Sequence, residues 1–392
     1  MCVGKLRISK GLIFLVSLTD HAHFDLAVTL IKETSRGGGS MILSPASIST
    51  ALYMVYLAAN GETRQELWRV LGRNARKIEI QRHFGKLLAN IDDARSSSYT
   101  LNIANRLYVR RGFSIQPSFL SIIQFHFGET LHYFTYEQRD QFAQEINNWV
   151  SIKTNNRIRK LMVTAKVNSE TEMLVFNIIY FQGIWKKPFI SEHTQNDIFH
   201  ISQSETKKMP MMLLRAELPY YEDHLVRVVK LPYVGDEVEM VIILPKILFN
   251  LPKIQEMITG KDLINYVYNA TRINVELKLP KFGLEAELNL EDALRKLGVA
   301  DIFSENANFR GLSNNPISVS NIIHKASFEV NEQGTGIMTT STKFNHSRNL
   351  IPTAYSFQHS VIFNANQPFM YFVVKNLKTI LYAGQCGRFC YF

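Results

Sequence analysis

Apolar residues recur at helical spacing in the first part of the chain. A helix is predicted over residues 20–34, where Asp20 can supply the N-terminal cap and the glycines at 37–39 stop the pattern. A second helix is predicted to begin near Ser44-Pro45, because proline is tolerated in a first turn, where its missing N–H costs nothing. Further helical patterns cover residues 62–72, 76–91 and 141–154.

Strand patterns dominate after residue 225, and a few predicted strands lie before it. Residues 173–181 form a near-continuous apolar run, which is typical of a strand buried on both faces. Residues 226–231 and 238–244 are predicted to form a hairpin around residues 233–236. One late helix is predicted at residues 288–297, ending at Gly298. The other predicted strands are residues 101–109, 273–279, 322–330, 369–374 and 379–383.

Helices followed mainly by strands of antiparallel character predict a single α+β domain over residues 20–392. Neither a linker-like segment nor an internal repeat interrupts residues 44–330. Residues 334–361 break the pattern, because they form a long polar segment between two predicted strands. Loops longer than about 15 residues are uncommon in compact domains and are usually functional or disordered.

Residues 1–19 allow two interpretations. Three basic residues precede the apolar stretch 11–18, as in a short signal peptide, but no small-x-small cleavage site follows. The alternative is an uncleaved N-terminal extension. We favour export, so an extracellular location is expected, with the cytoplasm as the alternative. Asn269 and Asn345 begin glycosylation sequons, which matter only in a secreted chain.

Composition places the chain among folded proteins. The 392 residues are 46% hydrophobic and 20% charged, which excludes a disordered or collagen-like chain. No apolar run reaches the roughly 18 residues of a membrane span. The 44 Lys and Arg against 34 Asp and Glu leave a net charge of +10, which favours acidic partners in general. Of the three cysteines, Cys386 and Cys390 could pair, bind a metal weakly or stay free.

The sequence carries no enzyme signature. HExxH, G-x-S-x-G, P-loop and CxxC motifs are all missing from it. We therefore predict a protein that is not an enzyme, with no cofactor or metal. A monomer without nucleic-acid or membrane partners is expected.

Seven segments resemble the serpin family in order and spacing. They are SPASISTAL at 44–52, INNWVSIKTNNRIRKLM at 146–162, MLVFNIIYFQGIW at 173–185, KKMPMM at 207–212, LPKFGLEAELNLEDALRKLGV at 279–299, NIIHKASFEVNEQGTG at 321–336 and PFMYFVV at 368–374. The resemblance implies three β-sheets, eight or nine helices and an exposed reactive loop, which would be residues 334–361. It also implies inhibition of a serine protease: the target cuts the loop, and the freed N-terminal part inserts into the central sheet. A non-inhibitory serpin that binds or carries a ligand is the alternative.

The hinge, residues 332–340, decides between these alternatives. The inhibitory pattern of the family is matched by Glu332, Gln333, Gly334 and Thr335, and Glu332 is expected to pair with Lys281. Inhibitory members then prefer small residues, and here Gly336, Thr339 and Thr340 fit that preference. The hinge departs from it at Ile337 and Met338. Side chains alternate between the faces of a strand, so Ile337 would share a face with Thr335 and, further on, with Lys343.

Counting from Glu332 by the family's usual spacing places the reactive bond at Arg348–Asn349. An arginine there suits a pocket with a carboxylate at its base, as in trypsin-like proteases, which are therefore the predicted targets. Lys343 is the second choice.

Other family sites match as well. Ser44, Ser47, Asn177 and His324 correspond to the polar "shutter" under the central sheet, and Trp185 corresponds to the "breach" at the loop's entry point. Core packing is the simpler interpretation of His324 and Trp185. Some serpins bind heparin-like polyanions through basic helices in the region of residues 62–86, although a solvated helix face is the simpler interpretation. The candidate residues there are Arg69, Arg73, Arg76, Lys77, Arg82 and Lys86.

Overall fold

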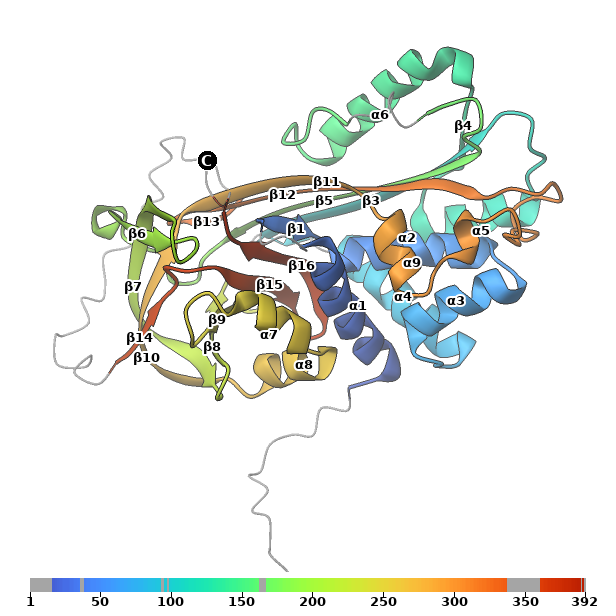
Figure 1. The fold of residues 1–392 in the computed structure, drawn as a ribbon. Coiled ribbons are helices and arrows are strands. Elements are labelled where there is room, and N and C mark those ends of the chain that lie inside the picture. Colours follow the sequence, from blue (N-terminus) through green and yellow to red (C-terminus); the bar gives the residue numbers. More distant parts are fainter. Residues whose placement is uncertain are drawn as a thin grey trace, which may run out of the picture.

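A computed structural model describes residues 16–35, 39–92, 95–96, 99–161, 167–336, 360–388 and 390. Its central sheet has seven strands and lies below helix α6 in Figure 1. In order across the sheet these are β11 (Phe282–Asn289), β12 (Val319–Val330), β13 (Gly334–Thr335), β5 (Met173–Ile184), β3 (Tyr99–Arg110) and β2 (Arg95–Ser96), with β4 (His132–Phe134) beside β3.

Nine strands form the second sheet. Across it run β1 (Met41–Leu43), β16 (Thr379–Cys386), β15 (Phe369–Lys375), β9 (Val238–Pro245), β8 (Val226–Pro232), β7 (Thr206–Glu222), β10 (Thr271–Pro280) and β14 (Val361–Asn364), with β6 (Gln195–His200) beside β7. The long strand β7 pairs with β6 and β10 and meets β8 only at its end, through residues 220–222. Two of the three expected sheets are therefore continuous through β7.

The described residues contain nine α-helices, in agreement with the predicted α+β fold. They are α1 (Leu18–Thr34), α2 (Pro45–Ala58), α3 (Gly61–Gly72), α4 (Lys77–Asp92), α5 (Pro117–Phe127), α6 (Arg139–Lys153), α7 (Leu251–Met257), α8 (Gly260–Tyr268) and α9 (Glu291–Lys296). The main core lies between the sheets and the other helices, whereas α6 packs on the opposite face of the central sheet. Its buried residues Phe142 and Ile146 form a separate core with Leu174 and Phe176 of β5.

Helix α1 begins earlier than predicted. Its N-cap is Ser17, whose hydroxyl accepts a hydrogen bond from the Asp20 N–H at 3.1 Å. The Asp20 carboxylate accepts in turn from the Ser17 N–H, which completes a capping box. Asp20 therefore caps from inside the first turn, and residues 18 and 19 belong to the helix. The stretch 1–15, which carries most of the signal-peptide prediction, lies outside the described residues.

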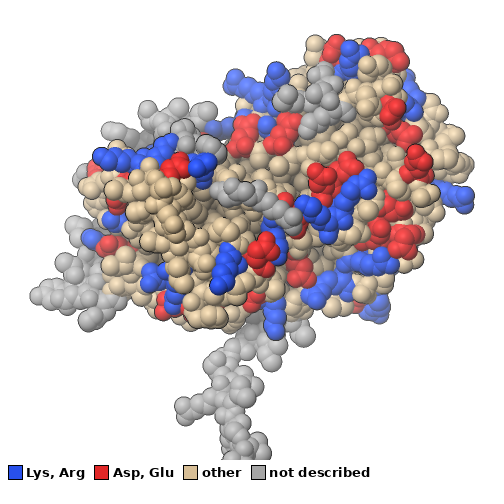
Figure 2. Space-filling model, viewed as in Figure 1, with Lys and Arg blue, Asp and Glu red and all other residues tan. Residues whose placement is uncertain are grey.

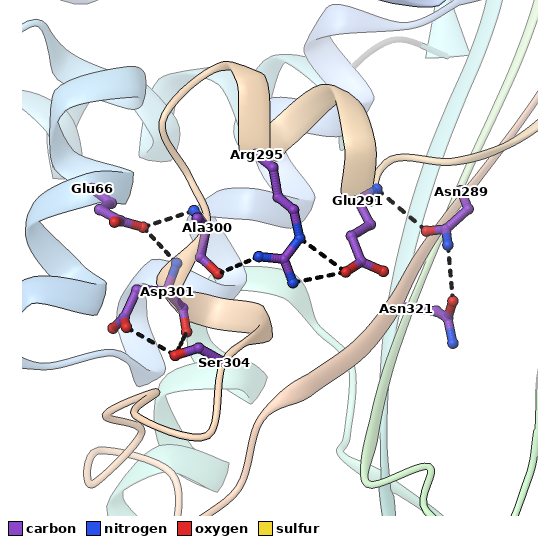
Figure 3. Close-up of polar contacts among 8 residues, drawn as sticks. All are labelled: Glu66, Asn289, Glu291, Arg295, Ala300, Asp301, Ser304 and Asn321. Atoms are coloured by element: carbon purple, nitrogen blue, oxygen red, sulfur yellow. Dashed lines mark hydrogen bonds and ion pairs between the residues drawn. The ribbon is translucent and has the colours of Figure 1, made fainter.

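The helix predicted at residues 288–297 was too long. Leu288 and Asn289 end strand β11, and α9 begins only at Glu291. Figure 3 shows why: the Asn289 side chain accepts from the Glu291 N–H at 3.3 Å and donates to Asn321 of β12 at 3.0 Å. The same asparagine thus accepts from the first N–H of the helix and ties the helix to the sheet.

Several helices and strands were not predicted, and three strand pairs are parallel although antiparallel sheets were expected. Helices α5, α7 and α8 and strand β11 lacked a prediction, and so did most of β7. Strands β5 and β12 run parallel, as do β10 with β14 and β3 with β4. The parallel pairing of β5 with β12 matters most, because it forms the centre of the candidate site.

Candidate functional site

Strands β5 and β12 meet along only part of their length. They pair directly over residues 173–179 and 319–326, a contact we call the seam. Beyond the seam they diverge, and the two-residue strand β13 fills the gap. Thr335 pairs with Val330 on one side and with Gly183 on the other. The start of the hinge is therefore already a strand of the central sheet.

Thr335 points into the main core. It is fully buried, and its hydroxyl lies 2.6 Å from the hydroxyl of Tyr233. Burial raises the pKa of Tyr233, so that phenol stays protonated. The Tyr233 ring stacks on Trp185 with ring centroids 4.4 Å apart. Trp185 donates to the Asn331 carbonyl at 2.9 Å, so the predicted breach residue holds the chain immediately before the hinge.

Glu332 forms the expected ion pair with Lys281. The Lys281 Nζ lies 3.1 Å from its carboxylate, and the Thr194 hydroxyl donates to the same group at 2.9 Å. Burial acts to raise the pKa of Glu332, but hydrogen bonds and the Lys281 charge outweigh it and hold the pKa below its ordinary value. An ionised Glu332 therefore fixes the base of the loop.

The four predicted shutter residues lie together. The Ser44 N–H donates to His324 Nε2 at 3.0 Å, which leaves the proton on Nδ1 to be donated to the Asn177 side-chain oxygen. The Asn177 amide donates to the Ser47 hydroxyl at 2.6 Å. His324 and Asn177 are register partners of β12 and β5, so their hydrogen bond crosses the seam.

Two further residues, Asn105 and Thr50, belong to this network and were not predicted from the sequence. Asn177 also donates to the side-chain oxygen of Asn105, and Asn105 donates to the Thr50 hydroxyl at 2.8 Å. Asn105 is the register partner of Asn177 on β3. The available signal was a polar residue at the centre of the mostly apolar run 101–109. Such residues in a buried strand require a partner.

Burial lowers the pKa of His324 to about 3, and burial together with the nearby His83 lowers that of His23 to about 3. Both histidines therefore stay neutral in the folded state between pH 6.5 and pH 3, whereas in the unfolded state they bind a proton in this range. Stability contributed by their neutral forms is present above pH 6.5 and is lost as pH falls toward 3. Each histidine contributes at most about 1.4 kcal/mol per pH unit in this range.

We predict that the unfolding midpoint in urea decreases between pH 7 and pH 4. His324→Gln should make the midpoint depend less on pH than it does in the wild type. His23→Gln should have the same effect, because its histidine is buried in the same way. Equal pH slopes for the wild type and His324→Gln would contradict the assignment.

Most of the loop prediction lies outside the described residues. This applies to the rest of the hinge, to the reactive bond, to the second-choice bond and to one sequon: Ile337, Met338, Thr339, Thr340, Arg348, Asn349, Lys343 and Asn345. The other sequon asparagine, Asn269, is exposed directly after α8.

The six basic candidates do not form one patch. Three of them form surface ion pairs: Arg69 with Glu62, Arg73 with Asp25 and Arg76 with Glu79, at 3.0, 3.1 and 3.0 Å. Lys77 stands at the start of α4. On the face viewed in Figure 2, Lys and Arg are interspersed with Asp and Glu.

Only Arg82 and Lys86 converge on a shared feature. They line a hollow of about 480 Å³ together with the first turn of α1 and Lys378, which precedes β16. Lys378 was missed because it is distant in sequence from α4. Helix N-termini favour anions, although Asp20 and Glu79 also line this hollow.

Cys386 and Cys390 form a disulfide with Cα atoms 5.1 Å apart, and both are buried. Of the three alternatives left open, pairing is the one observed. Among the described residues, no group of three or more His, Cys, Asp or Glu could hold a metal ion. Within the same ranges, no helix is long and apolar enough to span a membrane.

The chain is similar in sequence to a known family and to curated proteins over most of its length. The family model described as "Serpin (serine protease inhibitor)" matches residues 21–388. The "Leukocyte elastase inhibitor" of Xenopus tropicalis is 35% identical over 381 residues, covering 95% of this chain and 98% of that protein. Human "Neuroserpin" is 30% identical over 379 residues, covering 93% and 90%.

Solved structures agree with the fold. Uncleaved ovalbumin matches with a TM-score of 0.84 at 25% identity, covering 94% of this chain and 99% of that one. A thyroxine-binding globulin complex with thyroxine matches with a TM-score of 0.83 at 24% identity, covering 95% and 99%, and this likeness bears on the fold alone.

Proposed function

The chain belongs to the serpin family, and from this premise we propose that it traps a trypsin-like serine protease by inserting its cleaved loop into the seam between β5 and β12. It is a protease inhibitor and not an enzyme. The observation that carries the mechanism is the position of β13. Because Gly334 and Thr335 already occupy the open end of the seam, insertion needs only to extend an existing strand.

The register of β13 predicts where each following residue would go. Extending it places Ile337 opposite Phe181, and Ser341 opposite both Asn177 and His324. Cross-strand neighbours point to the same face of a sheet. Ser341 would therefore enter between the two side chains whose hydrogen bond closes the seam. Its hydroxyl can donate and accept, so it can replace that bond.

The same register identifies the obstacles to insertion. Thr335 faces the main core, so Ile337 would enter between the buried rings of Phe181 and Phe328. Met338 would lie on the other face, beside Tyr180. Lys343 would enter the main core opposite Val175, where an unpaired amino group is costly. We propose that Ile337 slows insertion and that Lys343 opposes its completion.

The proposed bait residue is Arg348, because an exposed arginine at the family's spacing from Glu332 fits a pocket with a carboxylate at its base. The names of the elastase-inhibitor relatives favour a second specificity, for a protease that accepts an apolar or aromatic residue. Tyr355 and Phe357 offer such side chains in the stretch that precedes β14.

One experiment tests the function and the specificity together. The protein is incubated separately with trypsin, chymotrypsin and elastase, and the products are separated on a denaturing gel. A complex that resists boiling supports trapping, and the mass of the released C-terminal fragment identifies the bond. A fragment that begins at Asn349 supports Arg348, whereas one that begins after Tyr355 or Phe357 supports the second specificity. Cleavage without any complex would contradict the inhibitor mechanism.

The alternative of a ligand carrier has less support. A carrier site is usually an apolar cavity of several hundred cubic ångströms. The apolar hollow between α1, α7 and β15, lined by Val28, Gln255 and Phe372 among others, has no room for a water molecule.

Two features support an extracellular location, with the cytoplasm as the alternative. Disulfides persist mainly in oxidising compartments, and Cys386 and Cys390 are paired. Asn269 is exposed, as a glycosylation acceptor must be. We further propose a monomer without cofactor, nucleic-acid partner or membrane association.

Polyanion binding, if present, should depend on the hollow that Arg82 and Lys86 line. Heparin affinity of the wild type should then fall steeply with salt, because counterions are released as charges pair. Arg82→Ala/Lys86→Ala should weaken binding and lower the salt slope by about 2. The matched control is Arg69→Ala/Arg76→Ala, because both of those arginines form ion pairs with glutamates. Heparin that fails to bind at low salt would leave the cluster as a solvated surface.

A further inference from the structure

The turn after α6 reaches the hinge. Asn155 and Asn156 both adopt left-handed backbone, with φ of 51° and 61°, and reverse the chain at the end of the helix. The reversal brings the half-buried Arg157 to the hinge, where its Nη2 donates to the Gly336 carbonyl at 2.9 Å. These residues are far apart in sequence, and the bond joins α6 to the last described residue of the hinge.

We propose that Arg157 is a latch that keeps the hinge from entering the seam until α6 moves. The inference rests on the proposed function, because it assigns a residue that sets the rate of loop insertion. Arg157 is a positioning residue: it touches neither the bait bond nor the protease.

The backbone of Gly336 explains what the latch holds. Its φ of 70° lies in the left-handed region, and a Cβ there would lie 2.5 Å from the Phe181 carbonyl oxygen, so only glycine fits. The Gly336 N–H already donates to the Glu329 carbonyl at 2.9 Å. In an antiparallel hydrogen-bonded pair the partners exchange both bonds. The Gly336 carbonyl accepts from Arg157, and full strand pairing would also require it to accept from the Glu329 N–H.

The position of α6 makes the latch a coupling device. The helix covers the outer face of the seam through Phe142, Ile146 and Trp149, which pack with Phe176 and Ile323. A strand entering the seam must separate β5 from β12 beneath this helix. Since Arg157 follows α6 within one turn, a displacement of α6 pulls Arg157 away from Gly336. Entry of the hinge and displacement of α6 therefore break the same charge-assisted bond.

Loss of the latch should accelerate insertion. For Arg157→Ala we expect the intact protein at elevated temperature to convert to a loop-inserted, trypsin-resistant form about tenfold faster than the wild type, as for loss of one hydrogen bond with a charged donor. The melting temperature of the cleaved protein should change little, because the bond to Gly336 is absent once the loop is inserted and only the contact of Arg157 with Tyr180 remains to be lost. Arg157→Lys keeps a cationic donor and should restore much of the wild-type rate.

The control is Arg159→Ala, because among the described residues Arg159 donates to the Asn156 carbonyl of its own turn and not to the hinge. This variant should convert at the wild-type rate, which separates the latch from a general weakening of the turn. The conversion assay is run beside trapping of trypsin on a denaturing gel. Wild type that traps trypsin while Arg157→Ala converts at the wild-type rate would overturn the latch alone. Wild type that neither traps nor inserts would overturn the proposed function, and the latch with it.

Discussion

Replacing Arg348 with alanine should reduce the rate of trypsin inhibition by about 100-fold or more. The guanidinium would enter a pocket whose base carries a carboxylate, and removing one partner of a buried hydrogen-bonded charge pair costs roughly 2–5 kcal/mol. The fold should be unaffected, because a surface substitution usually changes stability by less than about 0.5 kcal/mol. The measurement is the second-order rate constant for loss of trypsin activity, with thermal unfolding as the check on folding.

Two further variants sharpen this test. Arg348→Lys should retain much of the inhibition, because trypsin-like pockets also accept a lysine ammonium. If Arg348 is the bait residue, Lys343→Ala should inhibit trypsin with the same second-order rate constant as the wild type. Undiminished inhibition by Arg348→Ala, combined with loss in Lys343→Ala, would move the reactive bond to Lys343.

Cleavage of the loop should raise the melting temperature by ~10 °C or more. Extending β13 along the seam would add a central strand with hydrogen bonds on both sides, and it would replace the single bond between Asn177 and His324 by bonds to Ser341. At roughly 2.1 cal/mol/K of unfolding entropy per residue, a rise of this size corresponds to several kcal/mol. The measurement compares melting before and after trypsin cleavage. An unchanged melting temperature would exclude insertion and favour the non-inhibitory alternative.

Trapping should nevertheless be inefficient, with much of the protein consumed as substrate. Ile337 would have to pass between Phe181 and Phe328, and overpacking a filled core costs ~1–3 kcal/mol. That cost does not cancel the gain from a whole strand, but it slows entry while the acyl-enzyme hydrolyses.

Replacing both Ile337 and Met338 by alanine should therefore increase the trapped fraction. Met338→Ala alone is the matched control, because the register places Met338 on the face away from the main core. Lys343→Thr should instead raise the melting temperature of the cleaved form, since it removes a buried charge. The ratio of inhibitor to protease at full inhibition measures the first effect. Equal ratios for the wild type and the double variant would show that Ile337 is no obstacle.

The sequence by itself determined the elements that depend on neighbouring residues. The helix at Ser44-Pro45, the buried strand of residues 173–181 and the hairpin of residues 226–244 were all predicted and are confirmed. Their signals are local: a cap, a proline in a first turn, an apolar run or a turn between two strands. The misplaced helix at residues 288–297 has the converse reason, because its true start depends on Asn289 contacting Asn321 of another strand.

Only the tertiary structure decided which residues meet across the seam. That Thr335 faces the core follows from Tyr233, and the full shutter network requires Asn105 on a third strand. The contact of Arg157 with Gly336 spans 179 positions of sequence. Periodicity records which face of an element is buried, but it carries no information on which other element covers that face. Register and sheet order supply that information, and both exist only in the folded chain.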